Sequence, residues 1–312
     1  MGSLFPPPPP LAGLLLENCP LAGRTTWRMG GLARWLVSFR DIEDLVLFWG
    51  NLSRETPRFV LGGGSNILVA DAGFQGVVLD LTRGLNRIQL QQPVGPGNPE
   101  AILYAEAGAS TRALAHACRH LGLSGAEFLA GIPGSVGGAL VMNAGAFGGE
   151  IKDILIDALA LDPDGERHVL TPDTLKMRYR HTQLPLGWIF VSARFRLIPA
   201  DAEVIRKTMQ RFNHHRRTTQ PLAHPTAGST FKNPSQGPCA WKLIEAAGMR
   251  GASVGQARVS EKHCNFFINT GQASATDMTC LVRKVRDAVF AHSGIRLETE
   301  VGLLGPLGLE VF

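Results

Sequence analysis

Residues 131–150 read GIPGSVGGALVMNAGAFGGE, and the interpretation of the whole chain starts from them. The stretch holds seven glycines and shows little periodicity, so it is either a disordered linker or a loop that lines a ligand. Its apolar side chains favour an ordered, buried loop. Bare backbone at Gly134, Gly137 and Gly138, beside the rigid bend at Pro133, would suit a cofactor with a flat ring and a diphosphate. The structural alternative is two β-turns joined by a buried strand, but the density of glycine favours the ligand.

A second glycine cluster, LGGGSN at residues 61–66, follows a predicted strand at residues 58–61. Glycines after a strand let backbone N–H groups converge on phosphate oxygens without an intervening Cβ. The cluster is not a Walker A loop, because no Gly-Lys-Ser/Thr follows it. Nor is it a dinucleotide fingerprint, because Ile67 stands where the third glycine belongs. By itself it fits a tight turn and a phosphate cradle equally well.

A third segment, residues 216–234, reads RRTTQPLAHPTAGSTFKNP. Its cationic start, the serine between Gly228 and Thr230, and the pair Lys232–Asn233 could bind a diphosphate and present a hydroxyl group. It lacks the G-x-S-x-G pattern, which excludes a hydrolase nucleophile elbow. The alternative is a surface loop with solvated charges, which composition alone favours.

Two shorter segments carry charged groups. In the run from Arg178 to His181, an arginine could bind a carboxylate in bidentate fashion; the alternative is a solvated strand edge. Residues 297–301 (LETEV) alternate as a strand does. For Glu298 and Glu300, solvent-exposed carboxylates are the alternative interpretation.

Periodicity predicts short strands with intervening helices, hence an α+β or α/β protein. Helices are predicted at residues 41–50, 110–122 and 274–294, and after Asp201, and further strands at residues 67–69, 76–81 and 189–197. The helix after Asp201 carries Val204, Ile205, Met209 and Phe212 on one side and ends in the basic run 213–217. The strand at residues 189–197 alternates as a half-buried strand does. Pro199 and Asp201 mark the predicted domain boundary.

Composition excludes several classes of protein. Hydrophobic residues make up 45% of the 312 residues, which is ordinary for a chain that buries a core. The net charge of +5 is too small for a dedicated nucleic-acid binder and suits an enzyme with anionic ligands. No run approaches the ~18 apolar residues of a membrane helix. The five cysteines include no C-x-x-C pair, so they predict neither a disulfide scaffold nor a zinc site. The histidines His214 and His215 are adjacent and predict no metal site either.

The N-terminal stretch has no basic region, and Pro6 to Pro10 cannot continue a helix. A short polyproline extension therefore explains it better than a signal peptide does. Free thiols and a cytoplasmic location are the expectation.

Together with TTWRMGG at residues 25–31, these segments occur in an order that resembles the UDP-N-acetylenolpyruvoylglucosamine reductases, the MurB flavoenzymes of cell-wall biosynthesis. The resemblance runs from about Asn18 to Gly305. The pieces GIPGSVGG-x-x-x-MNAGAFG and AGSTFKNP are highly specific to that family, and their separation along the chain makes coincidence a poor explanation.

The resemblance implies an α+β fold: an FAD-binding domain of the vanillyl-alcohol-oxidase (PCMH) type with two α/β lobes, followed by a smaller α+β substrate domain. The predicted organisation is a proline-rich extension at residues 1–17, the FAD domain at 18–200 and the substrate domain at 201–312. The C-terminal segment is expected to return toward the flavin.

The implied reaction is reduction of the enolpyruvyl ether of UDP-N-acetylglucosamine to UDP-N-acetylmuramate. NADPH is the implied co-substrate and non-covalent FAD the cofactor, and no nucleic acid, membrane or obligate protein partner is implied. NADPH first reduces the flavin, and the enol ether then enters. A buildup of negative charge on the substrate requires a cation beside it. An ionised carboxylate would repel that charge, so Glu300 is expected to be neutral in the loaded site.

The resemblance assigns residues by position in the motifs. The implied catalytic residues are Arg180, Ser229 and Glu300. The implied flavin-contacting residues are Gly62, Gly63, Gly64, Ser65, Asn66, Gly131, Pro133, Gly134, Ser135, Gly137, Gly138 and Asn143. The implied substrate contacts are Arg217, Lys232, Asn233 and Asn265.

The sequence departs from the family pattern in three places. Phe147 stands where the family usually has tyrosine, and His181-Thr182 replaces the usual residues after Tyr179-Arg180. No tyrosine lies between Arg180 and Ser229, whereas one branch of the family has an inserted loop there whose tyrosine covers the substrate diphosphate. The chain therefore resembles the other branch, and Arg217 and Lys232 are the candidates for binding that diphosphate.

Two alternatives stay open. An oxidase or dehydrogenase of the same flavin superfamily would share the fold but would not need the Ser229 and Glu300 segments. A non-catalytic binder of nucleotides or nucleic acid would use the basic stretch 207–217 and would be colourless.

Overall fold

The structure is a computed structural model that describes residues 8–95 and 99–312. The first two prolines of the predicted polyproline run, Pro6 and Pro7, lie outside the described residues. The part of the predicted extension from Leu14 onward forms the edge strand β1. Within the described ranges, no helix combines the length and apolar character needed to cross a membrane.

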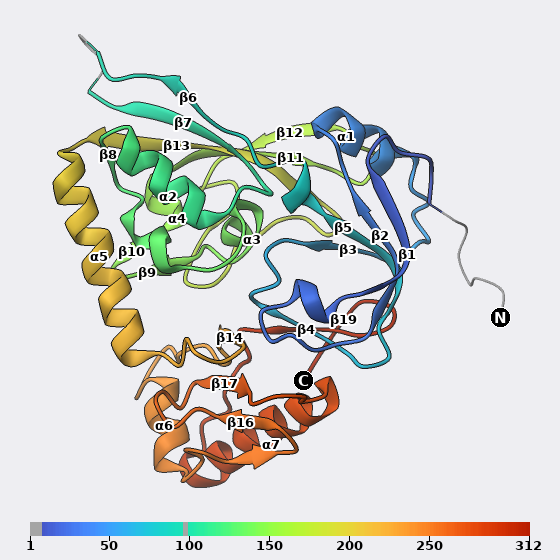
Figure 1. Cartoon of the computed structure of the whole chain (residues 1–312), viewed down its shortest axis with the longest axis vertical. Helices are drawn as coiled ribbons and strands as arrows, with labels where there is room; N and C mark the ends of the chain where they lie inside the picture. The colour runs from blue at the N-terminus through green and yellow to red at the C-terminus, as the bar shows by residue number, and fades with distance from the viewer. Residues whose placement is uncertain (1–7, 96–98) are drawn as a thin grey trace.

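The first lobe is a four-stranded sheet covered by one helix (Figure 1). Its strands run in the order β1 (Leu14–Pro20), β2 (Leu32–Ser38), β5 (Phe74–Asp80) and β3 (Arg58–Leu61). Helix α1 (Ile42–Asn51) begins where the Asp41 side chain accepts a hydrogen bond from the Asp44 amide, as its sequence predicts. Leu45, Phe48 and Trp49 of α1 pack with the side chains of β2 and β5 in one core.

The second lobe is a larger antiparallel sheet with helices on one side. Its strands run in the order β12 (Arg167–Leu170), β11 (Leu155–Leu161), β13 (Ile189–Pro199), β7 (Ala101–Glu106) and β6 (Ile88–Gln92). Helix α2 (Thr111–His120) begins at the cap Ser110. The remaining short elements of this lobe are β8 (Leu123–Ser124), η3 (Glu127–Gly131), α3 (Val136–Val141), β9 (Gly145–Ala146), β10 (Gly149–Glu150) and α4 (Ile151–Ile154). The short helix η2 (Leu81–Arg83) follows β5, and its Leu81 packs in the core of the first lobe.

Strand β13 is half-buried only along its second half. Its first five residues are all buried, because Ile189 and Val191 pack in the core of the first lobe while Phe190 and Ala193 pack in the core of the second. The strand is thus shared between the two lobes. Alternation begins only at Arg194, where one face reaches solvent.

Helix α5 (Ala202–Thr219) connects the second lobe to the C-terminal unit (Figure 1). Its residues Ile205 and Met209 pack into the core of the second lobe, whereas Val204, predicted to share their side, is exposed. By packing, α5 belongs with the lobe that precedes it. The division of the chain at residue 200 stays a prediction; in the structure it marks the end of β13, and the hydrophobic core changes only after α5.

The C-terminal unit is a small antiparallel sheet backed by two helices. The strands are β14 (Thr226–Ser229), β17 (Phe266–Asn269), β16 (Ala257–Val259) and β15 (Ser253–Val254), and the helices are α6 (Ala240–Ala246) and α7 (Ala275–Ser293). A capping box of Ser274 and Asp277 starts α7 at the predicted position, and Gly294 in the left-handed conformation ends the helix.

The first lobe and the C-terminal unit are joined by three kinds of contact. Strand β18 (Gly302–Leu304) pairs in parallel with β4 (Ile67–Val69), and β19 (Leu309–Glu310) extends this sheet. Trp27, which follows η1 (Ala22–Arg24), is fully buried in the C-terminal core and donates from Nε1 to the Phe267 carbonyl at 2.8 Å. Asp71 accepts hydrogen bonds from the first amides of α7.

Two predicted segments differ from expectation. The glycine-rich stretch 131–150 is ordered, as predicted, but it contains helix α3 and the short β9–β10 pair instead of forming a loop throughout. Ser135 caps α3 and the helix has only six residues, too few for periodicity to reveal it. Residues 297–301 form no strand; a single bridge joins Phe231 to Thr299, because the backbone of Glu300 bonds to two different segments.

Candidate active site

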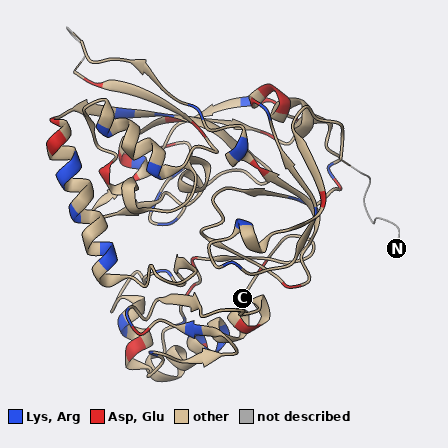
Figure 2. Ribbon diagram, viewed as in Figure 1, with Lys and Arg blue, Asp and Glu red and all other residues tan. Residues whose placement is uncertain are grey.

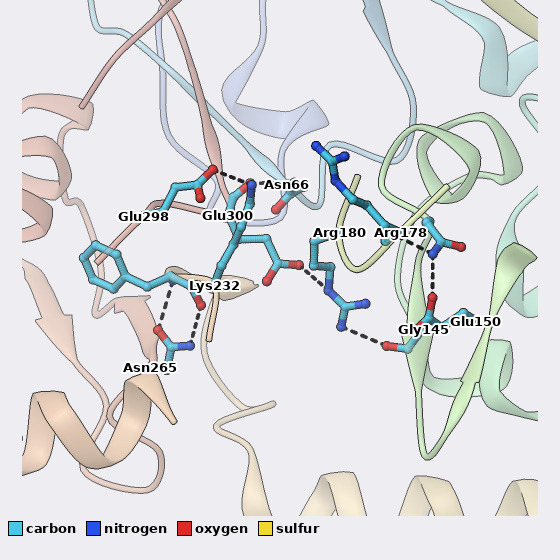
Figure 3. Close-up of polar contacts among 11 residues, drawn as sticks. Asn66, Gly145, Glu150, Arg178, Arg180, Lys232, Asn265, Glu298 and Glu300 are labelled. Carbon is cyan, nitrogen blue, oxygen red and sulfur yellow. Dashed lines mark hydrogen bonds and ion pairs between the residues drawn. The ribbon is translucent and has the colours of Figure 1, made fainter. Parts of the chain in front are cut away.

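Arg180 is presented by a tight turn. The Arg178 and His181 amides each donate to the other's carbonyl, at 2.9 and 3.0 Å, and Arg180 at the turn has φ of 50°. Its guanidinium reaches outward from this turn: Nε lies 2.9 Å from Glu300 Oε1, and Nη2 donates to the Gly145 carbonyl at 2.9 Å (Figure 3). The side chains of Arg180 and Glu300 are only 21% and 16% exposed, so the ion pair is largely shielded from water.

Glu300 is held by its backbone on both sides. Its amide donates to the Thr230 carbonyl at 2.9 Å, and its carbonyl accepts from Asn66 Nδ2 at 3.0 Å. Burial raises the pKa of the Glu300 carboxyl above its usual value, while Arg180 and Lys232 act in the opposite direction. The expected tendency of Glu300 toward the neutral form therefore has a physical basis in this site.

Ser229 lies near the Arg180–Glu300 ion pair because its neighbour Thr230 bonds to Glu300. It ends β14, next to Gly228 in the left-handed conformation and to Thr230, which accepts the Glu300 amide. Within the described part of the chain its hydroxyl has no hydrogen-bond partner, so it is free to meet a ligand. The structure thus brings the segments of the three predicted catalytic residues together from three distant parts of the sequence.

A cavity of about 990 Å³ adjoins this cluster through Gly63 and Gly228. Five arginines and no acidic residue line it among the described residues: Arg24, Arg28, Arg112, Arg216 and Arg217. Arg24 forms an ion pair with Asp80, but Arg216 has no carboxylate partner in the described structure, and burial together with the nearby Arg112 lowers its pKa. Figure 2 shows basic residues recurring along α5, whose C-terminal end borders the cavity.

The two glycine clusters meet at this cavity. A Cβ on Gly63 would lie 2.6 Å from the Gly134 Cα, and Ser65 Oγ donates to the Pro133 carbonyl at 3.0 Å. Gly131 packs as closely on Arg216, where a Cβ would lie 2.7 Å from Cδ. Bare backbone, and guanidinium groups such as that of Arg216 whose hydrogen-bond partner is the neutral amide of Gln220, fit a dinucleotide with a diphosphate, such as FAD, in a cavity of this size.

The predicted flavin-contacting residues divide into two groups. Gly63, Gly131, Pro133 and Gly134 line the cavity. The others are not among its lining residues. Gly62 packs against Ser135, which caps α3, and Asn66 Nδ2 donates to the Glu300 carbonyl.

Asn143 is not among the residues that line the cavity. It is completely buried, and its amide bonds to Glu150, to the Arg178 carbonyl and to the Lys152 amide. With no surface to offer a cofactor, it supports the turn that carries Arg180.

The predicted substrate contacts differ in position. Arg217 lines the cavity. Lys232 forms an ion pair with Glu298 at 2.5 Å, close to Glu300. The contacts of the other two are structural: Asn233 Oδ1 accepts from the Ala240 amide at the start of α6. The amide of buried Asn265 bonds to both the N–H and the carbonyl of Phe231 (Figure 3). Asn265 therefore shapes the Ser229 loop.

Sequence reasoning missed several residues of the cavity. Arg112 and His116 come from α2, which reads as an ordinary amphipathic helix, and nothing in its pattern distinguishes them. Arg28 and Thr25 belong to the motif at residues 25–31, which could have identified them as cavity residues. Residues 222–226 also line the cavity.

Two family models match the chain. The model described as the C-terminal domain of UDP-N-acetylenolpyruvoylglucosamine reductase matches residues 220–304. The model described as an FAD binding domain matches residues 33–171. The first covers the C-terminal unit, and the second runs from β2 to the end of β12.

Full-length relatives are similar over nearly the whole chain. A UDP-N-acetylenolpyruvoylglucosamine reductase of Magnetococcus marinus is 50% identical over 95% of this chain and 94% of its own length. One of Agathobacter rectalis is 44% identical, over 93% and 94%. The crystal structure of the Thermus caldophilus enzyme aligns with a TM-score of 0.76 at 33% identity, covering 94% of this chain and 99% of that one.

Proposed function

Because this chain belongs to the family of UDP-N-acetylenolpyruvoylglucosamine reductases, we propose that it reduces the enolpyruvyl ether of UDP-N-acetylglucosamine to UDP-N-acetylmuramate at the expense of NADPH. Family membership makes it an FAD-dependent oxidoreductase of peptidoglycan synthesis and confirms the predicted α+β fold with a PCMH-type FAD-binding domain. The electron donor, the residue roles and the order of steps form the proposal.

The FAD would lie in the cavity that both glycine clusters line. The Gly63 and Gly134 backbones would approach its diphosphate, and Arg216 and Arg112 would offset the negative charge. When bound and reduced by NADPH, FAD supplies the hydride that adds to the terminal carbon of the enolpyruvyl group. The side chains around Arg180 then have to manage the charge that appears on the substrate.

Arg180 would stabilise that charge. Hydride addition places negative charge on the neighbouring carbon and its carboxylate, and a fixed guanidinium lowers the energy of this state more than that of the neutral alkene. Arg180 uses Nε for Glu300 and Nη2 for the Gly145 carbonyl, so Nη1 stays available to the substrate carboxylate. The single observation that carries the proposal is this shielded guanidinium beside Glu300 and the Ser229 loop.

Ser229 would give the proton to the carbon that carries the charge. Its hydroxyl has no hydrogen-bond partner within residues 8–95 and 99–312, as a group awaiting a ligand requires. An alcohol is a weak acid, so the proton must be replaced through nearby Lys232 or through water. Glu300, with its pKa raised by burial, would donate a hydrogen bond as a neutral acid to the developing charge. Arg217 and Lys232 are the proposed partners of the substrate diphosphate.

An anaerobic titration tests the proposal. The purified protein should show the visible spectrum of a flavin, lose it on addition of NADPH, and regain it when the enolpyruvyl ether is added. Bleached protein that regains its colour with oxygen but not with the enol ether would support an oxidase of the same superfamily. A colourless protein that binds DNA in a salt-sensitive way would support the non-catalytic alternative.

A further inference from the structure

The turn that carries Arg180 is attached to the glycine-rich segment at three points. Thr182 Oγ1 donates to the Leu140 carbonyl at 2.6 Å. Asn143 Nδ2 donates to the Arg178 carbonyl at 3.1 Å, and Arg180 Nη2 donates to the Gly145 carbonyl at 2.9 Å (Figure 3). One short stretch of chain thus fixes the position of the turn before, at and after Arg180.

Asn143 is the central attachment, and both its Nδ2 and its Oδ1 form hydrogen bonds. Besides the bond to Arg178, Nδ2 donates to Glu150 Oε2 at 2.5 Å, and Oδ1 accepts from the Lys152 amide at 3.0 Å. The residue is completely buried and has φ of 40°. This pattern needs a group with both donors and an acceptor, which an amide supplies and a carboxylate does not.

The turn itself needs such support. Arg180 has φ of 50°, a conformation that is strained in a residue other than glycine and persists only when the surroundings enforce it. The guanidinium reaches Glu300 on one side and Gly145 on the other (Figure 3). A small shift of the turn would therefore move the charged group away from the reacting atoms.

We propose that Asn143 is a positioning residue that holds Arg180 in line with Glu300 and Ser229, through its hydrogen bond to the Arg178 carbonyl. This inference rests on the role of Arg180 in the proposed function. It gives a structural reason for an asparagine in the family motif that has no surface to offer the cofactor. Asn143 acts on the second half of the reaction, in which the substrate is reduced, and leaves the uptake of electrons from NADPH unaffected.

Two substitutions separate the hydrogen bond from the packing. Asn143→Gly suits the positive φ and deletes the amide; Asn143→Asp keeps the size but cannot donate to the Arg178 carbonyl. Both should slow re-oxidation of the flavin by the enolpyruvyl ether by roughly 10–100-fold, the order expected for a displaced catalytic group. FAD content and the rate of reduction by NADPH should match those of the wild type. Thr182→Val, which removes a different attachment of the same turn, should have a smaller effect in the same direction.

A double-mutant cycle with Arg180→Lys provides the decisive readout. If Asn143 acts through Arg180, adding Asn143→Asp to Arg180→Lys should slow re-oxidation by less than about 3-fold. Asn269→Asp is a matched control, because Asn269 is a buried amide that also bonds backbone on both sides, at Trp27 and Gly271. It should lower the thermal midpoint without altering the effect of Arg180→Lys.

Three other results would overturn the positioning role. The first is that the effects of Asn143→Asp and Arg180→Lys on the re-oxidation rate simply multiply in the double variant. The others are that Asn143→Asp slows flavin reduction and re-oxidation equally, or slows neither. If Arg180→Lys re-oxidises at the wild-type rate, the proposed function of Arg180 itself fails. Loss of FAD from both Asn143 variants while Thr182→Val keeps wild-type re-oxidation also contradicts the inference.

Discussion

The carboxyl group of Glu300 is largely buried and forms an ion pair with Arg180. Burial favours its neutral form, whereas Arg180 at 2.9 Å favours the charged form, and the pKa is raised on balance. A substrate carboxylate bound to Arg180 would add negative charge beside Glu300 and raise its pKa further. The neutral acid is then the form that can donate a hydrogen bond to the developing charge.

Substitutions of Glu300 test which form is used. Glu300→Gln keeps a neutral donor, so it should retain more re-oxidation by the enol ether than Glu300→Asp, which keeps the acid but shortens its reach. If the protonated acid is the active form, wild-type re-oxidation falls as the pH rises through the raised pKa, and this fall should be missing in Glu300→Gln. Single-turnover kinetics against pH measure both effects. Greater activity in Glu300→Asp than in Glu300→Gln would show that the acid itself is required.

Ser229→Ala should affect one half-reaction only. The variant should still be bleached by NADPH at the normal rate, but its re-oxidation by the enol ether should be slower by roughly 10²–10⁴-fold, the usual contribution of a positioned proton donor. Anaerobic stopped-flow absorbance separates the two steps. Equal losses in both would mean that Ser229 serves in binding and not in proton transfer.

Helix α7 is capped both by its own sequence and by another part of the molecule. The capping box of Ser274 and Asp277 is local, while Asp71 in the first lobe accepts from the Ala275 and Thr276 amides at 2.9 and 2.8 Å and from Thr276 Oγ1. Burial alone would raise the pKa of Asp71, but these hydrogen bonds lower it below its usual value. The charged carboxylate therefore connects the first lobe to the C-terminal unit.

Asp71→Ala should lower the free energy of unfolding by about 1 kcal/mol at neutral pH, as removal of a helix cap does. A lowered pKa means that the folded state releases this proton more readily than the unfolded state. The stabilisation is thus complete above the ordinary value of 3.8 and is lost as the pH falls through the lowered pKa. Urea unfolding of both proteins at several pH values measures the difference, which should shrink in acid. Thr276→Val removes only the hydroxyl contact, so its free energy of unfolding should fall by less. If the wild type and Asp71→Ala differed in this free energy by the same amount at all pH values, the role of the charge would be contradicted.

The whole molecule brings cations from separate elements to one cavity. Arg112 comes from α2, Arg216 and Arg217 from the end of α5, and Arg24 and Arg28 from the first lobe. The glycine clusters pack on one another and on Arg216 so closely that side chains there would clash. The fold therefore assembles a binding surface that no single segment carries.

Arg216→Met should weaken FAD binding by roughly 10–100-fold, the loss expected when one charged hydrogen bond to a phosphate is removed. Methionine keeps most of the packing of the arginine stem against Gly131. Equilibrium binding followed by quenching of flavin fluorescence measures the change. Arg206→Met is the matched control, because Arg206 lies on the same helix but pairs with Glu203 on the surface; its FAD affinity should stay at the wild-type value. Equal FAD affinity in Arg216→Met and Arg206→Met would show that Arg216 does not bind the cofactor.

Local pattern was enough for the features that depend on neighbours in the chain. The caps of α1, α2 and α7 and strands β3 and β4 follow from residues within a few positions of one another. The family resemblance needs several such local motifs in their order along the chain. The motifs also identified Arg180, Ser229 and Glu300 as candidates, and the structure brings their segments together.

Other features depend on residues that are far apart in the sequence and meet only after folding. Arg112 on an ordinary helix, Asp71 at the start of α7 and the burial of Asn143 under the Arg180 turn are of this kind. Their partners lie about 35 to 204 positions away, and periodicity carries no information on such pairs. Close packing selects one arrangement of these side chains, and in this arrangement Asn143 bonds to the turn that carries Arg180.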